Sequence, residues 1–142
     1  IGNFDGVHLG HQKLFNNAIK YKKKENLKIG VVTFDPIPKM FFVKKLKNYR
    51  ISNLNQKLKI FKKFNVDFVI NKKFDLKFSK VKAFNFIKDI LYKNLKPKYI
   101  FVSNNFRFGN KREGNVKQLI LNEKIFGFKI IKPKPLIRNN KI

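Results

Sequence analysis

Two histidines near the start of the chain are the side chains most suited to chemistry. His8 and His11 lie on either side of Gly10, within the opening stretch Ile1–His11. An apolar residue leads into small and polar residues, and an amphipathic segment follows, which is typical of a strand end, a tight loop and a helix N-terminus. Such a junction offers backbone N–H groups, a positive dipole end and imidazole donors to an anion. The opening stretch therefore predicts a site for nucleotide phosphates.

Zinc binding is the alternative function for this pair. Because His8 and His11 are three residues apart, a helix start would place both rings on one side. The sequence contains only these two histidines and no cysteine, so the usual third and fourth zinc ligands are missing. No metal ligands are predicted among the protein side chains.

Two later polar stretches also follow predicted strands. Asp35–Pro38 comes after the β-branched run Ile29–Phe34, and its two prolines stiffen the loop. Ser103–Asn115 follows Tyr99–Val102 and is a long, glycine-bearing loop with two aromatic residues. In an open parallel sheet these strand ends share one edge, where ligands bind, so the three stretches are expected to converge.

Strands and helices alternate along the chain, which predicts an α/β fold. We expect one domain over residues 1–142, with a parallel sheet of about five strands and helices on both faces. The expected helices cover residues 10–26, 54–64, 81–95 and 116–126, and the expected strands cover 29–34, 66–70, 99–102 and 128–131. The predicted core faces are Leu54, Leu58, Phe61 and Phe64 in one helix, and Phe84, Ile87 and Leu91 in another.

Capping signals refine these boundaries. Ser52 or Asn53 could begin the second helix, and Gly127 suits the end of the last one. Residues 39–53 are expected to form a loop with one helical turn. The lysine- and proline-rich residues 132–142 are expected to have little order by themselves.

The composition is strongly basic, with 34 Lys+Arg against 8 Asp+Glu and a net charge of +26. One interpretation is a basic nucleic-acid-binding module. The other is compositional bias, because lysines spread along the whole chain accompany much Asn, Ile and Phe, which share AT-rich codons. We favour bias and predict no specific nucleic-acid partner. The absence of cysteine and of an apolar run of about 20 residues predicts a cytoplasmic protein with no membrane partner.

Three motifs resemble those of one enzyme family. Ile1–His11 resembles the Gly-x-Phe-Asp-Gly-Val-His-x-Gly-His opening of the bacterial FAD synthetases, the bifunctional riboflavin kinase/FMN adenylyltransferases. Thr33–Pro38 is similar to their Thr-Phe-Asp-Pro-His-Pro, and Asn105–Gly114 to their Asp/Asn-Phe-x-Phe-Gly-x-x-Arg-x-Gly loop. The resemblance covers nearly the whole chain. It implies a Rossmann-like nucleotidyltransferase fold, and another His-x-Gly-His nucleotidyltransferase with a different acceptor is the alternative.

The resemblance also implies substrates and residue roles. ATP and FMN would react to give FAD and pyrophosphate, with Mg²⁺ accompanying ATP, and His8 and His11 would be catalytic. The implied ATP-binding residues are Gly2, Asn3, Phe4, Asp5, Gly6, His8, Gly10 and His11. The implied flavin-binding residues are Asp35, Pro36, Asn105, Phe106, Phe108, Gly109 and Arg112.

The chain departs from the family pattern at four positions. Ile37 replaces a usual His, Ser103 a usual Gly, Asn105 a frequent Asp and Gln56 a common Glu. The resemblance further implies a fragment that is truncated at both ends. A phosphate-binding Ile-Ser-Ser-Thr-x-x-Arg segment would begin near Ile142, so the fragment by itself could be inactive. A riboflavin kinase domain is expected in cis beyond it.

Overall fold

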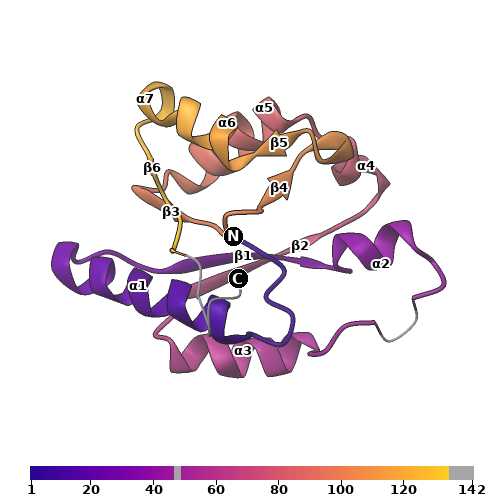
Figure 1. The fold of residues 1–142 in the computed structure, drawn as a ribbon, viewed down its shortest axis with the longest axis horizontal. Coiled ribbons are helices and arrows are strands. Elements are labelled where there is room, and N and C mark those ends of the chain that lie inside the picture. The colour runs from indigo at the N-terminus through magenta and orange to yellow at the C-terminus, as the bar shows by residue number, and fades with distance from the viewer. Residues whose placement is uncertain (47–48, 135–142) are drawn as a thin grey trace. The chain divides into compact units, whose positions relative to one another are not determined.

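The chain divides into two compact units, drawn in Figure 1. The computed structural model describes residues 1–46 and 49–134 and contains both helices and strands, in agreement with the predicted α/β class. Residues 1–72, joined by the chain from Pro133, make the first unit, and residues 73–132 make the second. A single domain over residues 1–142 stays a prediction. No helix within the described residues is both long and apolar enough to cross a membrane.

Within the described residues, the first unit contains one pair of strands and three helices. Its elements are α1 (Leu9–Glu25), β1 (Gly30–Asp35), α2 (Pro38–Phe42), α3 (Leu54–Lys63) and β2 (Phe68–Lys73). β1 and β2 are hydrogen-bonded neighbours. The predicted first helix and first strand are confirmed to within a residue at each end, and the predicted helical turn in the following loop is α2. β2 begins two residues later than expected.

The start of α3 confirms one of the two predicted caps. The side chain of Asn53 accepts from the N–H of Gln56, and the Gln56 side chain accepts from the N–H of Asn53, which is a capping box. The buried face of α3 differs from the prediction, because Leu58 is 39% exposed whereas Lys57 is buried beside Phe61. The face that packs inward therefore runs through positions 54, 57, 61 and 64.

The core of the first unit includes part of the opening loop. Its buried cluster is Phe4, Val7, Phe15, Val31 and Phe61, and the half-buried apolar residues packed against it are Ile60, Phe64, Val66 and Val69. The predicted packing role of Phe61 and Phe64 is confirmed. Because two members belong to the loop itself, folding of this unit also shapes the candidate site.

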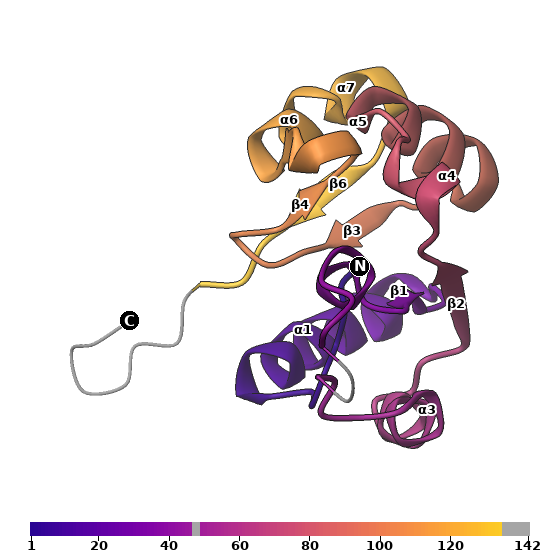
Figure 2. The ribbon, with the colours of Figure 1, turned by 90° about the vertical axis from the view of Figure 1, so that its right-hand side faces the viewer.

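The second unit contains two further strand pairs (Figure 2). Its elements are α4 (Leu76–Ser79), α5 (Ala83–Asn85), η1 (Phe86–Leu95), β3 (Tyr99–Phe101), β4 (Arg107–Phe108), η2 (Asn110–Arg112), β5 (Gly114–Asn115), α6 (Val116–Leu121), α7 (Glu123–Phe126) and β6 (Lys129–Ile131). β3 and β6 lie side by side in parallel, with Ile100 opposite Ile130. β4 and β5 pair antiparallel. The expectation of a loop over residues 103–115 is wrong in this respect, because the stretch folds into a short hairpin.

Two helix predictions need correction in this unit. The helix expected over 81–95 is a short α5 followed by the π-helix η1. The wider turn of a π-helix rotates the inward face, so Phe86, Ile87 and Leu91 are buried while Phe84 is 49% exposed. The helix expected over 116–126 is two helices that meet at Asn122, and Gly127 confirms the predicted cap with a φ of 74°.

The described strands pair two by two rather than in one continuous sheet. A parallel sheet of about five strands therefore stays a prediction. Residues 135–142, most of the stretch expected to lack order, lie outside the described chain.

Candidate functional site

The opening loop is held in shape by its own apolar residues. Phe4 and Val7 have positive φ angles of 49° and 33°, which non-glycine residues rarely adopt and which cost about 1–3 kcal/mol each. Both side chains are buried in the core of the first unit. Burial of such side chains contributes about 1.5–3 kcal/mol each, enough to offset that strain. The opening loop is also bonded to β1, because the N–H of Gly2 donates to the Val32 carbonyl at 3.1 Å.

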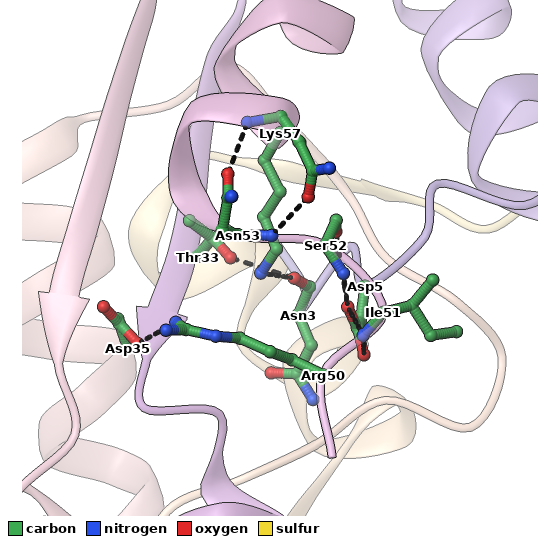
Figure 3. Close-up of polar contacts among 10 residues, drawn as sticks. Asn3, Asp5, Thr33, Asp35, Arg50, Ile51, Ser52, Asn53 and Lys57 are labelled. Carbon is green, nitrogen blue, oxygen red and sulfur yellow. Dashed lines mark hydrogen bonds and ion pairs between the residues drawn. The ribbon is translucent and has the colours of Figure 1, made fainter. Parts of the chain in front are cut away.

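Asp5 fastens the turn to the chain before α3 (Figure 3). Its carboxylate accepts from the N–H groups of Ile51 and Ser52 at 2.8 and 2.9 Å, and the Ser52 hydroxyl accepts from the N–H of Gly6 at 3.1 Å. Burial works to raise the pKa of Asp5, but these donors outweigh it and hold the pKa below its usual value. Asp5 is therefore an ionised structural support of the loop.

The two histidines stand together at the N-terminus of α1. Their rings are stacked, with centroids 3.8 Å apart. A Cβ on Gly10 would lie 3.1 Å from the His8 ring, so glycine leaves the imidazole the room it occupies. α1 has 17 residues and no acidic residue in its first turn, so its terminal N–H groups and dipole are available to an anion.

His11 is the more buried of the two rings. Phe4 contacts it edge-on at 5.1 Å, and Nδ1 of His11 is a buried atom without a hydrogen-bond partner in the described chain. Since an unpaired buried N–H costs more than an unpaired lone pair, the proton belongs on Nε2. Burial, followed by the charge of His8, lowers the pKa of His11 to about 4. His11 is therefore a neutral imidazole at pH 7.

Acid should destabilise the fold through His11. Its pKa of about 4 in the folded chain lies below the ordinary 6.5, so the unfolded chain binds the proton more tightly. Stability is expected to be fully present above pH 6.5 and to fall as the pH drops from 6.5 to 4. Urea unfolding across this range measures the effect. His11→Phe retains a ring but cannot titrate. In this variant the slope of the unfolding free energy against pH should decrease by the equivalent of up to one proton. An unchanged slope would contradict the lowered pKa of His11.

A hydrogen-bond cluster fixes the chain just before the loop. The backbone carbonyl of Asn3 accepts from Thr33 Oγ1 at 3.1 Å and from Lys57 Nζ at 2.7 Å. Lys57 was not among the site residues predicted from the sequence. The available signal was its register, because a lysine at position 57 falls on the apolar stripe that includes Phe61.

Asp35 lies at the end of β1, where the sequence placed it. Its Oδ1 accepts from Arg50 Nη1 at 3.1 Å in an exposed ion pair, so this carboxylate already has a partner. Pro36 follows it. Ile37, which replaces the family's usual His, is buried at the start of α2, so it serves packing.

The motif Asn105–Gly114 lies in the second unit, where it forms contacts of its own. Ser103 Oγ donates to Asn105 Oδ1 at 2.9 Å, and Phe106 stacks on Phe108 with centroids 5.5 Å apart. Phe108 is buried and also packs on Phe86. A structural role is thus evident for Phe108 that the sequence did not reveal.

Gly109 and Arg112 occupy unusual backbone positions beside this pair. Gly109 has a φ of 78°, and a Cβ there would lie 2.7 Å from backbone atoms of Ala83. Arg112, exposed and with a φ of 56°, ends the short helix η2. The structure therefore gathers the opening loop with Asp35 in the first unit and residues 105–112 in the second. The expected convergence of these two groups stays a prediction.

The described residues offer no group of three His, Cys, Asp or Glu side chains that could hold a metal ion. What the first unit provides is a glycine-bearing loop, two stacked imidazoles and a free helix N-terminus. These features belong to a protein of the α/β class, and backbone N–H groups and imidazoles at a helix N-terminus are donors of the kind that suit an anionic group.

Comparisons with known proteins place the chain more closely. The FAD synthetase family model matches residues 1–142. A bifunctional riboflavin kinase/FMN adenylyltransferase from Buchnera aphidicola subsp. Schizaphis graminum is 40% identical over 142 residues, which are 100% of this chain and 46% of that protein. The protein of the same name from Escherichia coli K12 is 38% identical over 130 residues, covering 92% of this chain and 42% of that one. This chain belongs to the FAD synthetase family.

The chain thus spans about half the length of the curated relatives it matches. Among solved structures, one titled as a macrolide-efflux protein from Streptococcus pneumoniae superposes with a TM-score of 0.82 at 26% identity, over 98% of this chain and 46% of that one. Efflux is the activity in that title, and the likeness concerns the fold.

Proposed function

We propose that this chain transfers AMP from ATP to FMN, giving FAD and pyrophosphate. The observation that carries the proposal is the stacked histidine pair at the free N-terminus of α1. Membership of the FAD synthetase family supports FMN as the acceptor. Curated relatives that match nearly the whole chain carry the name FMN adenylyltransferase.

The reaction is an in-line displacement at phosphorus. An oxygen of the FMN phosphate attacks the α-phosphorus of ATP, and a new P–O bond forms as the bond to the β-phosphate oxygen breaks. Pyrophosphate leaves with the electron pair. Little covalent chemistry falls to the protein, so catalysis rests on positioning and on stabilising charge.

The ATP phosphates bind at the opening loop in this proposal. Nε2–H of His11 donates to a phosphate oxygen, and a neutral ring does so without adding charge. His8, which is exposed beside it, provides a second donor. Terminal N–H groups of α1 complete the cradle, and Gly6 and Gly10 let the phosphates approach the backbone. The surrounding ATP-binding residues are Gly2, Asn3, Phe4 and Asp5, which shape this loop.

The flavin side belongs to the other motifs. Asp35 and Pro36 at the end of β1, with Asn105, Phe106 and Gly109 in the second unit, are the proposed contacts. Phe106 is the better candidate for the flavin ring, because Phe108 is already buried behind it. Arg112 is exposed and can meet a phosphate.

We infer the wider setting from the same family membership. The strands β1, β2, β3 and β6 belong to one parallel sheet of about five strands in a single Rossmann-like domain, which the parallel pairing of β3 and β6 supports. Mg²⁺ arrives with ATP, neutralises phosphate charge and is held mainly by phosphate oxygens. A riboflavin kinase domain in cis supplies FMN, as the relatives' bifunctional name suggests. A cytoplasmic location follows from the use of ATP and FMN.

Product analysis tests the proposal. The purified protein is incubated with ATP, Mg²⁺ and FMN, and chromatography with flavin fluorescence follows FAD while a coupled assay follows pyrophosphate. Equal amounts of both products are expected. Release of pyrophosphate from ATP with other phosphate acceptors, but not with FMN, would overturn the choice of acceptor. Salt-sensitive retention of DNA without FAD formation would favour a nucleic-acid-binding protein instead.

Gly10→Ala should separate activity from stability. Alanine is the better helix former by up to about 1 kcal/mol, so the melting temperature should stay level or rise. The added Cβ would press on the His8 ring at 3.1 Å and displace it by a few tenths of an ångström. We expect a rate about three- to tenfold lower, because small misplacements are costly in catalysis. Exposed Asn16, on the same helix, provides the control variant Asn16→Ala, whose rate should not change.

A further inference from the structure

Lys57 is a buried lysine that the reaction scheme above does not use. It lies on α3 and is 5% exposed, whereas the neighbouring lysine on the same helix, Lys59, is exposed. Its Nζ donates to the carbonyl of Asn3 at 2.7 Å (Figure 3). Burying an ammonium is costly unless it is paired and hydrogen-bonded, so a packing role alone would be served better by an apolar residue.

Among the described residues, the charges that act on Lys57 belong to two carboxylates of the candidate site and to Arg50, which pairs with one of them. Burial lowers the pKa of Lys57, while the carboxylates of Asp5 and Asp35 act in the opposite direction and Arg50 adds to the lowering. Asp5 supports the opening loop and Asp35 follows β1. The lysine is thus buried next to the loop and between two motifs rather than in a general part of the core.

The carbonyl of Asn3, which accepts from Lys57, lies directly before the turn of the opening loop. Asn3 directly precedes Phe4, whose backbone has positive φ and begins the turn that leads to His8. Thr33, which is fully buried in β1, donates to the same carbonyl at 3.1 Å. Both lone pairs of this oxygen are therefore used, one by a strand and the other by a helix.

We propose that Lys57 is a positioning residue for the ATP-binding loop. Its ammonium holds the Asn3 carbonyl against α3 and fixes the backbone that sets His8 and His11 at the phosphates. Thr33 holds the same carbonyl from the side of β1. The inference rests on the proposed function for the role of the loop, while the holding of the loop itself can be measured without catalysis.

Lys57→Met tests this inference, because methionine retains most of the length of the side chain and removes the charge. Hydrogen–deuterium exchange should show the amides of residues 4–11 exchanging about tenfold faster or more. The kcat for FAD formation should fall about ten- to a hundredfold, with the KM for FMN within about twofold of the parent, as expected when bound groups are misplaced. Lys59→Met is the matched control on the same helix and should change neither quantity.

A second variant keeps the test decisive. Thr33→Val removes the neutral donor to the same carbonyl and should cause a smaller change in both readouts, even if Lys57→Met does not fold. In the double variant the two effects should not add, since the residues share one partner. Unchanged exchange and unchanged kcat in the single variants would overturn the role of Lys57. If the parent forms no FAD, the proposed function fails, and the exchange data still decide whether Lys57 holds the loop.

Discussion

Replacing His11 with alanine is expected to slow FAD formation by about a hundredfold or more, the scale found for losing one donor to developing charge. Burial lowers the pKa of His11 to about 4, so the ring is neutral at pH 7, and its Nδ1 is a buried atom without a hydrogen-bond partner in the described chain. Stacking on His8 and edge contact with Phe4 hold the ring in one orientation. Initial rates at saturating ATP and FMN measure the effect.

The stability of the variant must be followed with its rate. Loss of the ring also removes contacts with Phe4, so thermal unfolding by circular dichroism should accompany the kinetics. Asn16→Ala, on the same helix and away from the site, should retain the parent rate. A His11→Ala protein that is folded and makes FAD at the parent rate would show that His11 does not act in the reaction.

Gly109→Ala is expected to destabilise the second unit strongly. The residue has φ 78° and ψ 175°, a region that only glycine adopts readily, and forcing another residue into it costs about 1–3 kcal/mol. In addition, a Cβ would lie 2.7 Å from backbone atoms of Ala83, so the hairpin must move away from α5. The total should exceed about 3 kcal/mol, and urea unfolding with an unchanged m-value measures it.

Gly127→Ala is the matched control for this change. Gly127 also has a positive φ of 74°, but a Cβ there would contact no atom of the described residues within 4 Å. Its substitution should therefore cost only the backbone strain, about 1–2 kcal/mol. Equal losses in the two variants would mean that close approach to Ala83 plays no part. The comparison of the two variants would also explain why a glycine occurs at position 109 of the motif Asn105–Gly114.

The sequence predicted correctly those elements that depend on residues close together in the chain. α1 and β1 follow from periodicity and from β-branched residues, Asn53 caps α3, and Gly127 ends α7 in the expected conformation. Each depends on neighbours a few residues away, so the signal is contained in a short stretch of chain. The motifs likewise predicted the family, which the comparisons show.

Other predictions failed where the backbone departs from a regular α-helix or from an open loop. Phe84 was expected in the core, but the π-helical turn of η1 rotates it outward. The stretch from Ser103 to Asn115 was expected to be a loop, yet β4 and β5 pair within it, because Gly109 and Gly114 allow backbone and ring to approach closely. Local propensity contains neither of these effects.

By itself, then, the sequence determined the α/β class, the family and the residues His8, His11 and Asp35 as candidates. Those depend on residue type and spacing. Only the tertiary structure decided that His11 is a half-buried imidazole with a lowered pKa, stacked on His8, and that Lys57 and Thr33 hold the Asn3 carbonyl. The reason is physical, since burial, pKa and hydrogen-bond partners arise from residues brought together across 30 to 54 positions of the chain.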